Sequence, residues 1–143
     1  MVTKNSAGNI LDLMVKTEEV KTIWVNFIDN FEVELKYLPR SELQKIAKRS
    51  TVSGWERHQK VDKLDDDNYL RNFVEKTMVS WRGLTQKTLA KIIPVKVTNP
   101  DEELIFSVEN AFQLLKNAYD LDTFVTNAVM DLSRFTEEAE KKI

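Results

Sequence analysis

The stretch from Lys21 to Leu38 constrains the fold most, because apolar residues recur in it at every second position. In its second half, Phe31 to Tyr37, apolar side chains alternate strictly with charged ones. The first half alternates as well, and the pair Asp29-Asn30 between them tolerates the left-handed backbone angles of a two-residue turn. The pattern predicts a β-hairpin whose second strand is buried on one face only.

An isolated hairpin is marginally stable, so helices are expected to cover its apolar face. Pro39 suits the first turn of a helix, and Leu43, Ile46 and Ala47 then share one stripe of a helix that ends near Arg49. The following stretch, Ser50 to Leu64, has many charges and little periodicity. It is therefore predicted to be a mobile loop or a weakly formed helix.

The rest of the chain has mainly helical periodicity. Three acidic residues, Asp65–Asp67, open a helix whose apolar stripe continues through Trp81 until Gly83 stops it. The segment from Leu84 to Pro100 is irregular, with room for a short helix and an extended piece. Beyond it, Ser107 is a plausible N-cap for the next helix, and a last helix begins near Asp122 and carries an apolar stripe from Phe124 to Phe135.

These elements predict an α+β, mostly α fold, in which an N-terminal β-hairpin is followed by about four helices. The length, 143 residues, suits one domain with one core. We expect residues 1–20 to form a partly ordered N-terminal segment, residues 21–135 to form the single hairpin-plus-helices domain, and residues 136–143 to form a frayed charged tail.

Composition limits the partners and the compartment. The net charge is −2, which gives the whole chain no attraction to nucleic acid or to an anionic membrane, so neither is expected as a partner. No apolar run approaches the roughly 20 residues that cross a bilayer. The first residues, Met1 to Asn9, are polar and lack the features of a signal peptide, so a cytoplasmic location is expected.

The residues needed for common catalytic and metal sites are scarce. The chain has no cysteine, and its single histidine, His58, stands in a polar stretch without partners for a triad or a metal cluster. Asp65–Asp67 do not begin a calcium loop, because Tyr69 and Leu70 occupy the fifth and sixth places. Three scattered glycines cannot form a phosphate loop. We therefore expect no catalytic, cofactor-binding or metal-binding residues, and a protein that is not an enzyme.

Three apolar side chains stand where a core does not readily explain them. Trp24 and Ile28 fall on the opposite face of the first strand from Ile23, Val25 and Phe27, and Trp55 lies in the polar stretch. Aromatic residues in such places are favoured at protein interfaces, where they bury a large area at a low entropy cost. Trp24, Ile28 and Trp55 are therefore candidate partner-binding residues, with intramolecular packing an open alternative for Trp24 and, less strongly, for Trp55.

Several motifs together resemble a known family. They are the strand and helix start from Phe31 to Arg40, the segment Val79 to Leu84 with its tryptophan and glycine, and the segment from Phe106 to Leu115. Their order, with the final helix after them, resembles the tail assembly chaperone family of long-tailed bacteriophages and prophages. The resemblance spans about residues 21 to 135.

The resemblance implies a function. Such chaperones bind the tape measure protein in the cytoplasm of an infected or lysogenic host and help to recruit tail tube subunits during tail morphogenesis. The alternative is a structural tail or connector protein that stays in the virion. The free edge of the predicted hairpin also suggests weak homo-oligomer formation.

Overall fold

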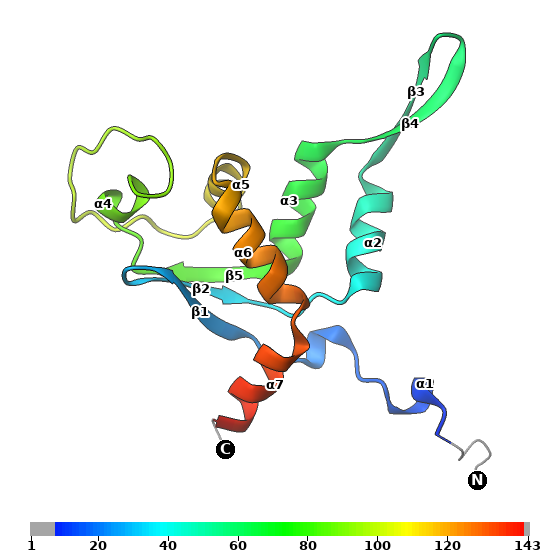
Figure 1. The fold of residues 1–143 in the computed structure, drawn as a ribbon, viewed down its shortest axis with the longest axis horizontal. Coiled ribbons are helices and arrows are strands. Elements are labelled where there is room, and N and C mark those ends of the chain that lie inside the picture. The colour runs from blue at the N-terminus through cyan, green and yellow to red at the C-terminus, as the bar shows by residue number, and fades with distance from the viewer. Residues whose placement is uncertain (1–7, 142–143) are drawn as a thin grey trace.

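In a computed structural model, the chain forms two β-sheets with helices between and around their strands (Figure 1). The structure describes residues 8–141, with side chains described as far as Thr136. In chain order the elements are α1 Ile10–Leu13, the 3-10 helix η1 Thr17–Glu19, β1 Ile23–Ile28, β2 Phe31–Leu35, α2 Arg40–Arg49, β3 Thr51–Glu56, β4 Gln59–Leu64, α3 Asp66–Thr77, β5 Met78–Arg82, α4 Gln86–Leu89, α5 Val108–Asn117, α6 Tyr119–Met130 and α7 Leu132–Lys141.

The prediction of a mostly α fold with one N-terminal hairpin is wrong. The fold is mixed, with 47% helix and 23% strand, and its strands are interspersed among the helices. Two segments account for the difference. The β3–β4 hairpin lies between α2 and α3, and β5 follows α3 directly and joins the first sheet.

The first hairpin, β1–β2, is where the alternation predicted it. The two strands pair antiparallel, and Asp29 in the turn has a φ of 51°, in the left-handed region that such turns require. β2 pairs with β1 on one edge and with β5 on the other. It is the central strand of the sheet, and its apolar residues have no exposed surface: Phe31, Val33 and Leu35.

The helix predicted to reach Trp81 ends at Thr77 instead. From Met78 the chain runs along the second edge of β2, where its backbone gains ladder partners, and Trp81 stands opposite Val33. The Lys36 N–H donates to the Thr77 carbonyl at 2.7 Å as the helix gives way to the strand. Trp81 is buried in this strand, and a continued helix would also have placed it inward, at helical spacing from Phe73. Hydrophobic periodicity therefore could not distinguish a helix from a strand at this position.

The prediction for Ser50 to Leu64 is also wrong, because this segment forms the antiparallel β3–β4 hairpin. Figure 1 shows it projecting from the ends of α2 and α3, away from the rest of the molecule. The turn residues are Arg57 and His58 in place of the usual glycine or asparagine. Since both faces of the ribbon are exposed, its apolar residues are not confined to one face, and the alternation that marked the first hairpin is missing.

The core lies between the first sheet and the helices. Helices α2, α3, α5 and α6 stand on one side of the three-stranded sheet (Figure 1). At the surface of the α3–α5 contact, Arg71 bonds the Glu109 carboxylate at 2.7 Å and lies 4.2 Å from the ring centre of Phe112. The largest fully buried side chains are those of Phe31, Phe73, Phe135, Ile23, Leu35, Leu84, Leu121, Val33, Val74, Val125, Val129 and Thr77.

The C-terminal part contains one confirmed prediction and one correction. The Ser107 hydroxyl accepts the Asn110 N–H at 3.0 Å, so Ser107 caps α5 as expected. The single last helix is in fact two, because α6 begins at Tyr119 and ends at Met130. The Asp131 carboxylate accepts the Ser133 hydroxyl at 2.6 Å at the start of α7. After this break Phe135 is buried, 5.5 Å from the ring of Tyr37.

The two ends of the chain are described only in part. Of the N-terminal segment 1–20, residues 1–7 lie outside the described residues, and the remainder holds α1 and η1. At the other end α7 continues to Lys141, while residues 142–143 lie outside the description, so fraying of the tail stays a prediction. Among the described residues, no helix combines the length and the hydropathy needed to cross a bilayer.

Candidate protein-interaction site

The β3–β4 hairpin is the most exposed regular element with a large aromatic side chain. Its strands pair without interruption from Thr51 opposite Leu64 to Glu56 opposite Gln59. Because directly paired residues share a face, Trp55 lies beside Lys60 on the face that also carries Leu64. Trp55 is 75% exposed, and both faces of the ribbon meet solvent.

The base of the hairpin is firmly held. The buried Ser50 follows the last turn of α2, and its hydroxyl donates to the Ile46 carbonyl at 2.8 Å. The Ser50 carbonyl accepts the Asp65 N–H at 2.8 Å, which joins the two ends of the hairpin, and the Asn72 amide of α3 donates to the Ser50 hydroxyl at 3.2 Å. The hairpin is thus a projection with an anchored base and an exposed tip.

The tip adopts an uncommon backbone conformation. Arg57 has a φ of 50° and His58 a φ of 67°, which are the left-handed angles of a two-residue hairpin turn. Each costs a side-chain-bearing residue about 1 kcal/mol relative to glycine. Both side chains are exposed, so the tip presents a guanidinium and an imidazole to solvent.

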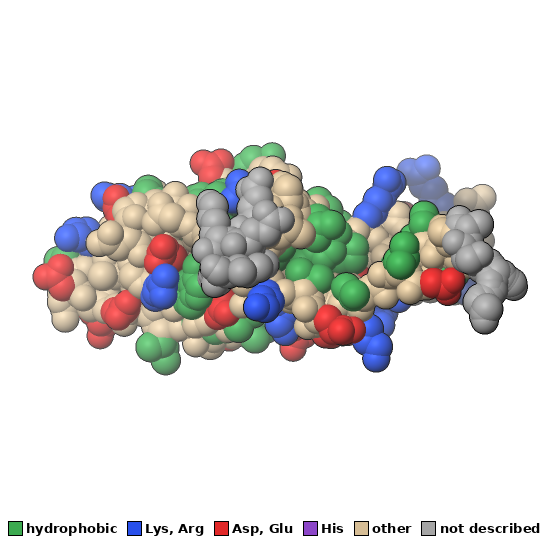
Figure 2. Space-filling model, turned by 90° about the horizontal axis from the view of Figure 1, so that it is seen from below, with side chains coloured by type: hydrophobic (Ala, Val, Ile, Leu, Met, Phe, Trp, Pro, Cys, Tyr) green, Lys and Arg blue, Asp and Glu red, His purple; other side chains and the backbone are tan. Residues whose placement is uncertain are grey.

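A second exposed apolar surface lies near the N-terminus. Figure 2 shows hydrophobic side chains at this end of the molecule. The sequence itself carries the signal, because a run of large apolar residues follows a polar start. The apolar side chains in and after α1 are 64–77% exposed: Ile10, Leu11, Leu13, Met14 and Val15.

The outer face of the first sheet holds Trp24 as predicted, opposite the core. There the Arg82 guanidinium lies 4.1 Å from the Trp24 ring centre, and Arg82 also bonds the Glu32 carboxylate at 2.6 Å. This cation–π contact partly covers Trp24 and supplies the intramolecular packing that the sequence left open.

The expected placement of Ile28 on that outer face is wrong. The register of β1 shifts between Asn26 and Ile28, so that Ile28 stands opposite Phe31 and packs partly buried against the core. A bulge of this kind reverses the faces beyond it, and alternation cannot reveal it. Trp24 and Trp55 lie in separate sheets, so the structure does not gather the three candidates into one site.

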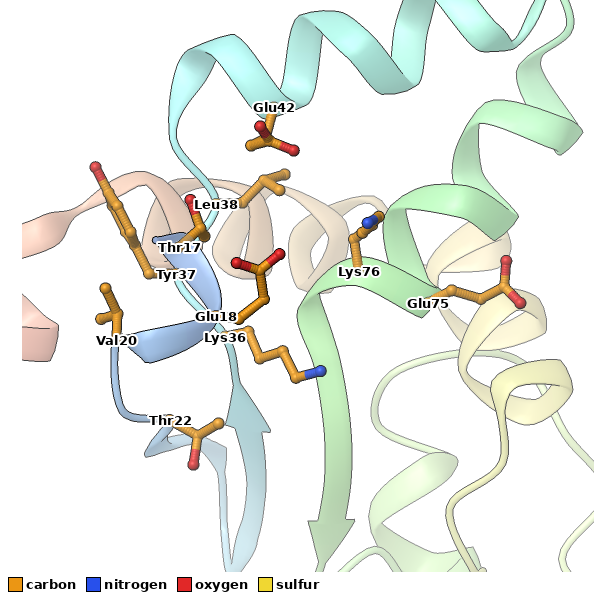
Figure 3. A pocket seen from close by; sticks show the side chains of 10 residues that line it. All are labelled: Thr17, Glu18, Val20, Thr22, Lys36, Tyr37, Leu38, Glu42, Glu75 and Lys76. Carbon is orange, nitrogen blue, oxygen red and sulfur yellow. The ribbon is translucent and has the colours of Figure 1, made fainter. Parts of the chain in front are cut away.

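Two cavities border the first sheet. One, of about 310 Å³, lies between η1, the end of β2, α2 and α3, and carries lysines and carboxylates together, including Lys36, Lys76 and Glu18 (Figure 3). Its mixed charges do not select a ligand of one sign. The other, of about 260 Å³, lies between β5, α4 and α5 and is mostly apolar. It is lined by Trp81, Leu84, Leu89, Ile93, Leu104, Asn110, Gln113 and Leu114.

The junction of α3, α5 and α6 contains the clearest perturbed acid. Burial raises the pKa of the Asp122 carboxyl, and a hydrogen bond from Thr126 partly opposes that shift. Burial also raises the pKa of Tyr69, and the nearby charge of Asp122 adds to the effect. Desolvation between packed helices accounts for both directions.

The described part of the chain holds no group of three or more His, Cys, Asp or Glu side chains placed to bind a metal ion. Comparison of the sequence and structure with protein-family models, curated proteins and solved structures finds no match. The exposed apolar surfaces are therefore the features of the described residues that bear most directly on function.

Proposed function

We propose that this chain is a tail assembly chaperone, which binds the tape measure protein of a long-tailed phage or prophage and helps to recruit tail tube subunits. It would act by binding and not by catalysis. The observation that carries the proposal is the exposure of large apolar side chains on two projecting segments, the N-terminal run and the β3–β4 hairpin. The ordered motifs between Lys21 and Phe135 add the resemblance.

Exposed apolar side chains on projecting segments suit a chaperone's task. Full burial of one large apolar side chain is worth about 1.5–3 kcal/mol, so a few of them can cover apolar helices of a partner. Ordering the segments and losing free translation offset much of that gain. The expected affinity is therefore modest, as it must be if tube subunits are to displace the chaperone.

Co-expression with the tape measure protein encoded in the same phage or prophage tests the proposal. We expect the tape measure protein to be insoluble alone and to co-purify in soluble form with this chain. Trp55→Ala should weaken recovery, whereas Tyr119→Ala, which removes an aromatic side chain 80% exposed at the start of α6, should not. Recovery of this chain without a soluble partner would refute the proposal.

Mass spectrometry of purified virions separates the chaperone from a structural tail or connector protein. A chaperone is absent from finished particles, because tube subunits replace it during assembly. Detection of this chain in the virion in amounts comparable to those of tail proteins would favour the structural role.

A further inference from the structure

Charge is distributed unevenly between one limb of the molecule and the remainder. We define the basic limb as residues 40–64, which comprise α2 and the β3–β4 hairpin. It contains seven Lys and Arg residues and three Asp and Glu residues, for a net charge of +4. Since the whole chain has −2, the other residues together carry −6. The exposed Trp55 therefore lies on the positively charged part of an acidic protein.

Part of the hairpin's charge is satisfied internally, and part is not. Lys63 forms an ion pair with Glu56, and the Asp62 carboxylate accepts the Ser53 hydroxyl at 2.6 Å. Arg57 and Lys60 form no ion pair with any described residue. Two cations near the tip are thus available to carboxylates from outside the chain.

We propose that the β3–β4 hairpin is a docking arm for an acidic amphipathic helix of the partner protein. Trp55 and Leu64 would contact the apolar side of that helix, while Arg57 and Lys60 would bond its carboxylates. The partner's identity rests on the proposed function, and the inference adds the chemistry of the segment that is bound.

The spacing along the hairpin fits a helix. Trp55 is paired with Lys60, and Leu64 lies four residues further on the same face, roughly 13 Å away at 3.3 Å per residue. Side chains two turns apart on an α-helix are separated by about 11 Å. One helix face can therefore reach both apolar positions.

The observations favour a protein partner over nucleic acid. Exposed apolar side chains stand on both faces of the hairpin, with Val52 on the face opposite Trp55. The ribbon offers only two cations free of ion pairs, whereas nucleic-acid surfaces concentrate many more.

The test uses the full chain and a fluorescein-labelled amphipathic helical peptide of about 20 residues, with leucines on one face and glutamates on the other. Fluorescence anisotropy should show binding that weakens with added salt. A matched peptide with lysines in place of the glutamates should bind at least about tenfold more weakly. Circular dichroism melting checks that every variant is folded.

Variants locate the contact. Arg57→Glu with Lys60→Glu should weaken binding of the acidic peptide by about tenfold or more, as should Trp55→Ala. The control Lys21→Glu with Lys96→Glu makes the same charge change at exposed positions outside the limb, and Tyr119→Ala removes an equally exposed aromatic ring. Both controls should bind as the wild type does.

Four outcomes would overturn the inference: absence of binding, equal binding of the two peptides, equal loss in variants and controls, or tighter binding to a DNA duplex of similar length. These outcomes are separable from failure of the proposed function. If Arg57→Glu with Lys60→Glu still recovers the tape measure protein, the chaperone proposal stands and the docking arm is wrong. If the acidic peptide binds through the hairpin but the tape measure protein does not co-purify, the docking arm stands alone.

Discussion

Gly83→Ala tests how β5 is joined to the first hairpin. Gly83 has a φ of +76°, and a Cβ atom there would lie 2.0 Å from the carbonyl oxygen of Asn30 and 2.7 Å from its carbon. Both are backbone atoms of the β1–β2 turn, so rotation of a side chain cannot relieve the overlap. The Gly83 N–H also donates to the Glu103 carboxylate at 2.9 Å, which further fixes this glycine.

Gly83→Ala should destabilise the fold through strain in its own backbone and in the first sheet. A left-handed backbone costs alanine about 1 kcal/mol, and displacement of the turn strains the β1–β2 and β2–β5 ladders, for a total of about 3 kcal/mol. For a chain of this length the melting temperature should fall by about 10 °C. Urea unfolding followed by far-ultraviolet circular dichroism measures the change.

Gly54→Ala is the matched control. Gly54 lies in β3, where an added Cβ meets no atom within 4 Å, so its free energy of unfolding should change by less than about 0.5 kcal/mol. A loss below about 1 kcal/mol for Gly83→Ala, or equal losses for both variants, would refute the claim that close approach to Asn30 requires this glycine.

Three further predictions concern α6, the hairpin turn and α7. Because burial raises the pKa of Asp122 in the folded state, the folded chain holds more protons than the unfolded chain between the two pKa values. The free energy of unfolding of the wild type should therefore decline relative to that of Asp122→Asn as the pH rises from roughly 4 toward neutrality. Urea titrations in which the two proteins show parallel pH profiles would contradict this prediction. His58→Gly removes the strain of a left-handed backbone at a residue with a side chain. Hydrogen exchange at hairpin amides should therefore slow by about fivefold, while the global unfolding midpoint stays unchanged. Faster exchange would contradict the turn geometry. Phe135→Ala should reduce the free energy of unfolding by about 3 kcal/mol, since Phe135 is fully buried beside Tyr37. The side chain of Leu132 is 45% exposed, so Leu132→Ala should reduce it by less than about 1 kcal/mol in the same urea assay. Equal losses in the two variants would show that α7 does not pack as described.

The sequence predicted elements where one physical requirement governed the residue pattern. The β1–β2 hairpin was predictable because burial of a single face forces strict alternation, and Asp29-Asn30 supplied a turn of matching chemistry. The Ser107 cap and the acidic start of α3 were predictable because free N–H groups at helix starts need acceptors.

Prediction from the sequence failed where one residue pattern suited both a helix and a strand, or where no burial requirement shaped the pattern at all. Trp81 reaches the core in either a helix or a strand, and the need of β2 for a second partner decided between them. The β3–β4 hairpin buries neither face, so no burial pattern marked it. The exposure of Trp55 was anticipated from its polar surroundings, whereas the bulge that turns Ile28 inward depends on pairing across the hairpin and leaves no local signal.

The candidate surfaces lie outside the core, so partner binding and folding stability depend on different residues. The buried cluster runs from Ile23 to Phe135, and neither the N-terminal run nor the β3–β4 hairpin contributes a residue to it. Ser50 lies between the β3–β4 hairpin and the core. Its hydrogen bonds to α2 and α3 hold the base of the hairpin in place, independently of any contact made at the tip. Substitutions at Trp55 or Lys60 should therefore change partner affinity while leaving the free energy of unfolding nearly constant. If the chain acts as the chaperone proposed above, this separation is useful, since release of the partner does not require any part of the chaperone's own core to open.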